Sequence, residues 1–207
     1  MKRFSLYFVI CIIAFPSLAQ TNYGLKGGAS VTNLKSEGWE DKRTKLGMAV
    51  GLIAESKINR QFFLRPELIF STKGFKFQTS SAGEDGVVNL SYISIPFLAG
   101  FRPKDKIAIL AGPEFSYLQD AKSKHNGKIY DLTRSYNRFD LCMNLGFQYN
   151  ISKQVGVELR YSHSLIAFSG VVLGTPPPMD FIVDYIGVYK ARNQSLQLNL
   201  FYLFSGK

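Results

Sequence analysis

The residues that come nearest to a catalytic arrangement in this sequence are Ser162, His163 and Ser164. A serine becomes a nucleophile when a neighbouring histidine accepts its proton and a carboxylate orients the imidazole ring. If the three residues lie on one β-strand, both serines face away from His163, because successive side chains of a strand point to opposite faces. We therefore expect His163 to lie at an interface and not in a catalytic site.

Two acidic residues, Glu114 and Glu158, raise the question of acid–base catalysis by a carboxylate pair. They lie on segments that are not adjacent, with no evident access for a substrate, so we expect salt bridges instead. The glycine-rich stretch Gly24–Ser30 lacks the Gly-Lys-Ser ending of a phosphate-binding loop. His125 is the only histidine besides His163, which leaves a histidine-based metal site short of ligands. The sequence thus predicts no catalytic residues, no metal site and no cofactor.

A basic cluster in the polar stretch 119–138 is the strongest candidate for binding a ligand. Its cations would suit the phosphates of lipopolysaccharide, and plain solvation of the charges is the alternative. The segment Thr175–Pro178 would stiffen another polar stretch and could bind a protein partner. The net charge is +10, but nucleic acid is not an expected partner of an exported chain. The basic residues of the cluster are Lys122, Lys124, His125, Lys128, Arg134 and Arg138.

The N-terminus has the layout of a cleavable secretory signal. Two cations precede the apolar run Phe4–Phe15, and Ser17 and Ala19 place small residues at the −3 and −1 positions. The run of 12 residues is too short for a transmembrane helix, which needs about 20, and a retained anchor is the alternative. We expect a signal peptide over residues 1–19 and one domain over residues 20–207.

The expected domain contains one cysteine, Cys142, so no intramolecular disulfide can stabilise it. It lacks an apolar run long enough for a transmembrane helix, so a membrane span would need strands that close into a barrel. From Phe139 to Ile151, apolar residues at odd positions alternate with polar or small residues at even positions. Eight segments follow this alternation: Tyr23–Thr32, Lys45–Ile58, Phe62–Thr72, Leu90–Phe101, Ile107–Leu118, Phe139–Ile151, Val155–Ser162 and Ser195–Phe204.

The connections between these segments alternate in length. Short turns at one end and long loops at the other are typical of bacterial outer-membrane barrels, whose short turns face the periplasm. An even number of strands also places both ends of the domain on the short-turn side. The short connections are residues 59–61, 102–106 and 152–154, and the long ones are residues 33–44, 73–89, 119–138 and 167–193.

The polar face of the segments indicates what surrounds the barrel. A sheet face in contact with water would have little use for many glycines, whereas a crowded lumen needs small residues and charges that can pair. The opposite face is aliphatic and aromatic, which suits lipid. An exported soluble barrel that binds an apolar ligand is the alternative. We expect these lumen charges: Lys26, Glu55, Arg65, Glu67, Glu114, Asp140, Glu158 and Arg160.

The short turn at residues 59–61 predicts one ion pair. It sets Ile58 opposite Phe62, and counting back along both strands places Glu55 opposite Arg65. Such pairs, together with inward apolar residues, should fill the lumen, because the interior of an eight-stranded barrel is only wide enough for its own side chains. The expected apolar residues of the lumen are Ile53, Phe63, Ile69, Leu98 and Leu110.

Several short motifs occur along the chain in a characteristic order: Gly24–Ser30, Arg65–Leu68, Tyr92–Leu98, Gly112–Glu114 and Leu159–Tyr161. Together they resemble the PorT-like "porin family" outer-membrane barrels of Bacteroidetes. The resemblance covers nearly the whole expected domain. It implies an eight-stranded barrel in the outer membrane of a Gram-negative cell, mostly of unassigned function.

These observations predict an all-β fold, an eight-stranded antiparallel up-and-down transmembrane barrel with short periplasmic turns and long outer loops. We interpret the chain as a non-enzymatic outer-membrane protein with a filled lumen, whose outer loops serve adhesion or interaction. Its expected partners are outer-membrane lipid, lipopolysaccharide, the barrel-insertion machinery and a protein partner at the outer loops. A lipid-modifying barrel enzyme that uses His163 is the alternative of a different class.

Overall fold

The computed structural model describes residues 21–36, 42–79, 84–125, 128–166 and 191–204. The expected signal peptide and the segment Thr175–Pro178 lie outside these ranges. Almost all of the described chain is β-strand, and one short 3-10 helix, η1 (Thr133–Ser135), interrupts it. No helix among the described residues is long and apolar enough to cross a membrane.

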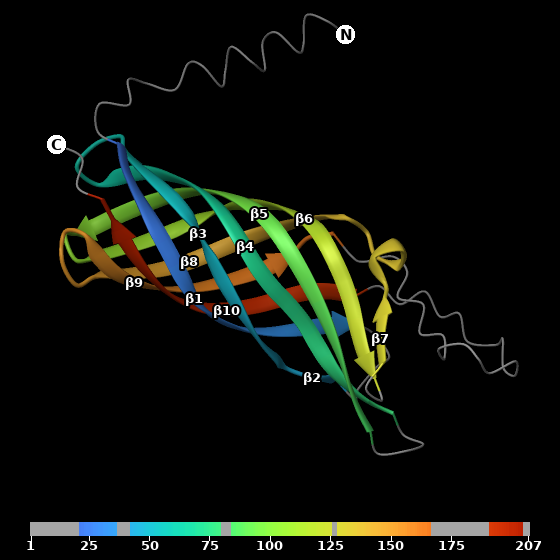
Figure 1. Cartoon of the computed structure of the whole chain (residues 1–207). Coiled ribbons are helices and arrows are strands. Elements are labelled where there is room, and N and C mark those ends of the chain that lie inside the picture. Colours follow the sequence, from blue (N-terminus) through green and yellow to red (C-terminus); the bar gives the residue numbers. More distant parts are fainter. Residues whose placement is uncertain (1–20, 37–41, 80–83, 126–127, 167–190, 205–207) are drawn as a thin grey trace, which may run out of the picture.

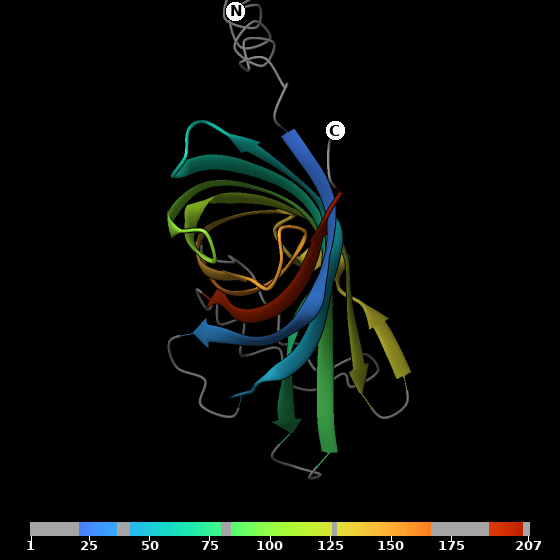
Figure 2. The same cartoon turned by 90° about the vertical axis from the view of Figure 1, so that its left-hand side faces the viewer.

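Eight strands form a closed barrel in which each strand is antiparallel to both of its neighbours (Figures 1 and 2). Neighbours along the chain pair in turn, and the first strand pairs with the last and so closes the ring. The predicted eight-stranded antiparallel barrel is therefore confirmed. Its strands are β1 (Thr21–Ser36), β3 (Lys45–Lys57), β4 (Phe62–Thr79), β5 (Glu84–Lys104), β6 (Ile107–His125), β8 (Phe139–Asn150), β9 (Val155–Ser164) and β10 (Ala191–Leu203).

Short turns join the strands at the end of the barrel that lies on the left of Figure 1. Asn59 stabilises the turn between β3 and β4, because its side-chain oxygen accepts bonds from the backbone N–H groups of Gln61 and Phe62, at 2.9 and 2.8 Å. Ser152 acts in the same way between β8 and β9, where its hydroxyl accepts from the N–H of Val155 at 3.0 Å. We call this end the short-turn end, and β1 begins there and β10 finishes there.

All four stretches expected to be long loops contain some strand residues. β4, β5 and β6 continue past residues 72, 90 and 118, where the expected segments stop or start, and they project beyond the rest of the barrel (Figure 2). Two short strands extend this projection: β2 (Lys42–Arg43) pairs with β4, and β7 (Lys128–Asp131) pairs with β6. Exposed residues here include Lys76, Lys122 and Lys124, so the composition resembles that of a loop although the strands persist. We call this the projecting sheet.

Candidate functional site

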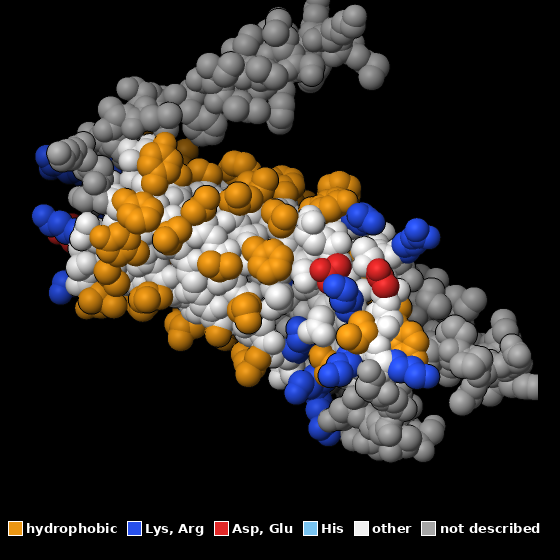
Figure 3. Space-filling model, viewed as in Figure 1, with side chains coloured by type: hydrophobic (Ala, Val, Ile, Leu, Met, Phe, Trp, Pro, Cys, Tyr) orange, Lys and Arg blue, Asp and Glu red, His pale blue; other side chains and the backbone are white. Residues whose placement is uncertain are grey.

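The barrel carries its charges inside and its large apolar side chains outside. The eight expected lumen charges are all buried, with exposed fractions between 0% and 4%. The outward side chains of the same strands are apolar, as the orange groups over the barrel wall in Figure 3 show. Leu145, at the middle of β8, is 59% exposed although it is a leucine, whereas its buried neighbour Asn144 is 3% exposed. A soluble protein would show the reverse arrangement.

The apolar outer surface has the height of a lipid core. On β8 the outward side chains run from Phe139 to Tyr149, and all the exposed ones among them are apolar. Ten residue steps of about 3.3 Å each, tilted by about 40°, give a height of about 25 Å. That is the height of the apolar band of outer-membrane barrels.

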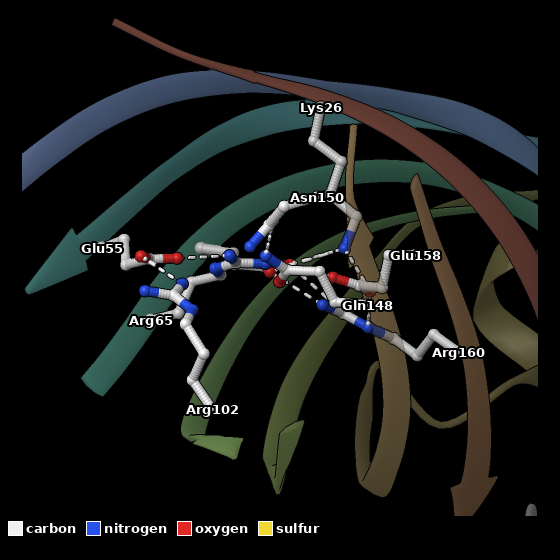
Figure 4. A network of polar contacts seen from close by, with 9 residues as sticks. Lys26, Glu55, Arg65, Arg102, Gln148, Asn150, Glu158 and Arg160 are labelled. Carbon is white, nitrogen blue, oxygen red and sulfur yellow. Dashed lines mark hydrogen bonds and ion pairs between the residues drawn. The ribbon is translucent and has the colours of Figure 1, made fainter. Parts of the chain in front are cut away.

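Arg160 belongs to the buried charge cluster drawn in Figure 4. Its two terminal nitrogens donate to both oxygens of Glu67 at 2.8 and 2.7 Å, and its Nε lies 2.7 Å from Glu158 Oε1. Lys26 contacts the same two carboxylates, at 2.7 Å from Glu158 and 3.4 Å from Glu67. Two cations and two carboxylates thus satisfy one another across the lumen, and they come from β1, β4 and β9.

The charge cluster continues toward the short-turn end through Arg65 and Glu55. These two side chains form the ion pair that the turn at residues 59–61 predicts. Arg65 also contacts Glu158 at 3.2 Å, which joins this pair to the central cluster. Glu55 accepts a second bond, at 2.8 Å, from Arg102 of β5. The structure therefore places Arg102, which sequence reasoning assigned to a turn, in the mouth of the lumen.

A second polar group lies nearer the projecting sheet. Glu114 contacts Lys73 at 3.4 Å and accepts a bond from the side-chain amide of Asn144 at 3.0 Å. Asp140 accepts bonds from Ser164 at 2.5 Å and Asn193 at 3.2 Å. The structure thus brings six of the eight expected charges into one cluster and places Glu114 and Asp140 in a separate group.

Lys73 is a lumen residue that sequence reasoning missed, because it fell in a stretch expected to be a loop. Its side chain is buried at 3% exposure, and its ammonium lies 5.1 Å from the centre of the Tyr92 ring. The signal for it was present in the sequence. Ser71, Lys73 and Phe75 continue the inward positions of β4, and all three are buried. The alternation of β4 therefore extends further than its apolar outward residues do.

Apolar side chains occupy the lumen on both sides of the charges. Phe63 packs with Leu98, Ala108 and Leu110 at the short-turn end, and its ring fills the space where a Cβ of Gly100 would lie. A larger cluster lies at the projecting sheet. Burial there raises the pKa of the Tyr136 hydroxyl to about 12. The larger cluster comprises Phe75, Val88, Leu90, Tyr92, Leu118, Ala121 and Tyr136, with Leu132 packed against it.

His163 lies apart from the serines on either side of it. Ser162 and Ser164 are buried in the lumen at 2% and 0% exposure, whereas the outward ring of His163 stacks against Tyr161. The ring nitrogen Nδ1 lies 3.2 Å from the amide nitrogen of Gln194. Neighbouring strand positions thus hold the imidazole and the two hydroxyls on opposite faces. Among the described residues, no three His, Cys, Asp or Glu side chains gather in a way that could hold a metal ion.

The basic residues expected on one outer loop occupy several elements. Lys122 and Lys124 are exposed on β6, Lys128 is exposed on β7, and Arg134 belongs to η1. Arg138 precedes β8, where it donates to the hydroxyl of Tyr117 at 2.9 Å. The expected loop is thus a hairpin with a helical turn, and the side chain of His125 is outside the described part. Figure 3 shows the Lys and Arg groups gathered at this end, with few acidic ones among them.

The fold is similar to those of known bacterial surface proteins. Neisserial surface protein A matches with a TM-score of 0.56 and 13% identity, over 89% of this chain and 99% of that chain. Ail of Yersinia pestis, in its complex with the heparin analogue sucrose octasulfate, matches with a TM-score of 0.51 and 15% identity, over 89% and 99%. At such identities the likeness shows the fold alone. Among curated proteins, none matches the sequence significantly.

The sequence also matches a protein-family model over residues 18–170. That range covers most of the chain and includes the strands that supply all eight expected lumen charges. The family is described as the outer membrane protein beta-barrel domain. The match agrees with the closed eight-stranded ring and with the apolar outer band of the structure. The chain therefore belongs to the outer membrane protein beta-barrel domain family.

Proposed function

We propose that this chain is a non-enzymatic barrel of the outer membrane with a filled lumen, and that its projecting sheet and outer connections serve adhesion or interaction at the cell surface. The observation that carries the proposal is the reversed placement of side chains, with charges inside and large apolar groups outside. Such a molecule is stable in lipid and not in water. Its wall holds it in the membrane, and its two ends are left to meet other molecules.

The lumen contents support a filled barrel in place of a channel. Ion pairs join strands on different sides of the ring, as between Arg160 of β9 and Glu67 of β4. Apolar clusters lie toward the short-turn end and at the projecting sheet. An interior of eight strands offers little more room than these side chains need. A role in interaction therefore fits the molecule better than passive diffusion of solutes.

The position of His163 argues against the alternative of a lipid-modifying enzyme. A serine nucleophile needs its base within hydrogen-bond reach. Ser162 and Ser164 face the lumen, and the hydroxyl of Ser164 donates to Asp140 and not to an imidazole. His163 instead lies on the outer face, among Tyr161 and Gln194. These contacts suit a side chain at the boundary between lipid and water.

The basic side chains at the projecting end support contact with lipopolysaccharide. Arg138 is exposed directly beside Phe139, at the edge of the apolar band, and Lys122 and Lys124 are exposed further out along β6. Phosphates of the outer leaflet would lie beyond the edge of this band. Tyr117 contacts the guanidinium of Arg138 and so helps to hold it there. The similar barrel Ail was solved with sucrose octasulfate, a polyanionic sugar derivative. A polyanionic saccharide is thus a reasonable ligand for this end of the barrel.

Replacing Lys122, Lys124 and Arg138 together by glutamine should weaken binding of the folded protein to lipopolysaccharide by about tenfold. Each phosphate contact of an exposed cation contributes up to about 1 kcal/mol. Binding can be measured in nanodiscs by titration with purified lipopolysaccharide at two salt concentrations. The matched control replaces Lys104, Lys106 and Lys153, which lie at the short-turn end, and it should leave the affinity unchanged. Equal losses in both triple variants would contradict a specific contact.

Three finer features belong to the same proposal. Cleavage after Ala19 would release the chain into the periplasm, where the barrel-insertion machinery would take it up. The motifs around Arg65 and Tyr92 support a place among the PorT-like "porin family" barrels of Bacteroidetes. A protein partner would meet the projecting sheet, since these strands extend beyond the rest of the barrel (Figure 2).

A further inference from the structure

The short-turn end of the barrel contains an open hollow of about 510 Å³. It lies between the turn that joins β3 to β4 and the turn that joins β5 to β6. In an outer-membrane barrel this end faces the periplasm. The hollow is thus separate from the basic surface at the projecting end. Its lining residues are Lys57, Ile58, Asn59, Arg60, Arg102 and Asp105.

The lining of the hollow is basic. Lys57, Arg60 and Arg102 supply three cations, and Asp105 supplies one carboxylate. The excess of two positive charges would balance the two negative charges of a phosphate dianion. Figure 3 shows Lys and Arg groups at this end of the barrel. The described turns here also carry Lys104, Lys106 and Lys153.

Arg102 is held at the floor of the hollow. Its Nη2 donates to Glu55 Oε1 at 2.8 Å, and its guanidinium lies 4.6 Å from the centre of the Phe63 ring. The side chain remains 16% exposed, and its Nε is buried without a hydrogen-bond partner. A guanidinium fixed in this way loses little conformational entropy when it binds a ligand.

The charge of Arg102 is not fully compensated by the lumen. Glu55 is shared with Arg65, and the carboxylates behind it, Glu67 and Glu158, bind Arg160 and Lys26. Four cations therefore face three carboxylates in the connected cluster. The surplus positive charge lies at the end that opens into the hollow, where an anion would balance it.

We propose that this hollow binds a phosphate group. Arg102 would supply the fixed contact at its floor, and Lys57 and Arg60 would reach the same oxygens from the β3–β4 turn. Asp105 would oppose the ligand and limit its affinity. The phosphate could belong to a soluble periplasmic molecule or to the headgroup of an anionic lipid in the inner leaflet. Both sources present the same chemistry to these residues.

The test titrates inorganic phosphate and pyrophosphate into the folded protein in an uncharged detergent, by calorimetry, against chloride at equal ionic strength. Lys57→Gln and Arg60→Gln should each weaken binding about three- to tenfold. Asp105→Asn should tighten it by a similar factor, because the opposing charge is removed. Lys153→Gln is the matched control, an exposed cation of the same end that does not line the hollow, and it should change nothing. The slower gel migration that unfolding causes would show whether each variant is folded.

A second arm distinguishes the two sources. If the hollow binds the headgroup of an anionic lipid, nanodiscs of phosphatidylglycerol should weaken pyrophosphate binding, because the headgroups compete for the hollow. Nanodiscs of phosphatidylcholine, whose headgroup is not anionic, should leave pyrophosphate binding unchanged. Equal pyrophosphate affinity in both kinds of nanodisc would assign the site to a soluble phosphate. Absence of binding beyond that of chloride would overturn the proposal. So would a loss in Lys153→Gln as large as that in Arg60→Gln, which would mean diffuse attraction to the whole end.

Discussion

Arg160→Met should lower the free energy of unfolding by about 3–5 kcal/mol, because it leaves buried carboxylates without their main partner. Glu67 loses both of its bonds from the guanidinium, at 2.8 and 2.7 Å, and keeps only the contacts with Lys26 at 3.4 Å. Glu158 loses the contact with Arg160 Nε but keeps Lys26 and Arg65. Glu67 is therefore the carboxylate whose negative charge the substitution leaves least compensated.

The measurement is urea unfolding in lipid vesicles, followed by the change in gel migration between folded and unfolded barrel. A second substitution, Glu67→Gln, should recover much of the loss in the Arg160→Met background, since it removes the unpaired charge. Arg138→Met is the matched control, because Arg138 is exposed and should contribute less than about 1 kcal/mol. Equal stability of Arg160→Met and the wild type would contradict a tightly packed charge cluster.

Leu145→Arg should destabilise the barrel in lipid by about 2–4 kcal/mol. Leu145 lies at the middle of the apolar band on β8, opposite Ala111 on one side and Tyr161 on the other. An arginine there would place its charge in the hydrocarbon core. In a water-soluble barrel the same position is a surface position, and the substitution would be almost neutral.

The same unfolding assay in vesicles measures this effect. Leu145→Phe keeps the position apolar and should cost little. Gln119→Arg places the new charge just beyond the band, on an exposed position of β6, and should also cost little. A small effect of Leu145→Arg, equal to that of Gln119→Arg, would favour the soluble barrel that the sequence left open.

The strands and their faces could be predicted from the sequence because two environments act on alternate residues. Lipid selects residues such as Leu145 and Phe147 on one side, and the lumen selects Asn144 and Gly146 on the other. The Glu55–Arg65 pair followed from the same alternation, because a short turn fixes the register of the two strands it joins. The number of strands, their inward and outward faces and the register at this short turn could thus be predicted from local sequence.

The partners of the lumen charges could not be predicted in this way. Arg160 and Glu67 lie on β9 and β4, which are not neighbours, so their contact depends on the diameter and stagger of the ring. The ends of the strands were missed for a different reason. Beyond the lipid, outward-facing residues no longer need to be apolar, so the alternation of apolar and polar residues disappears from the sequence. Lys73 therefore has polar neighbours in the sequence although β4 continues.

The filled lumen is the central claim, and conductance across a planar lipid bilayer tests it most directly. The purified barrel, inserted singly, should show no large and steady ionic current, because ion pairs and apolar clusters occupy its interior along the axis. Insertion can be verified on the same sample by its resistance to unfolding in detergent, with a porin of larger strand number as the conducting control. A stable open channel with a conductance of porin size would contradict the account and would assign the protein to passive diffusion of solutes.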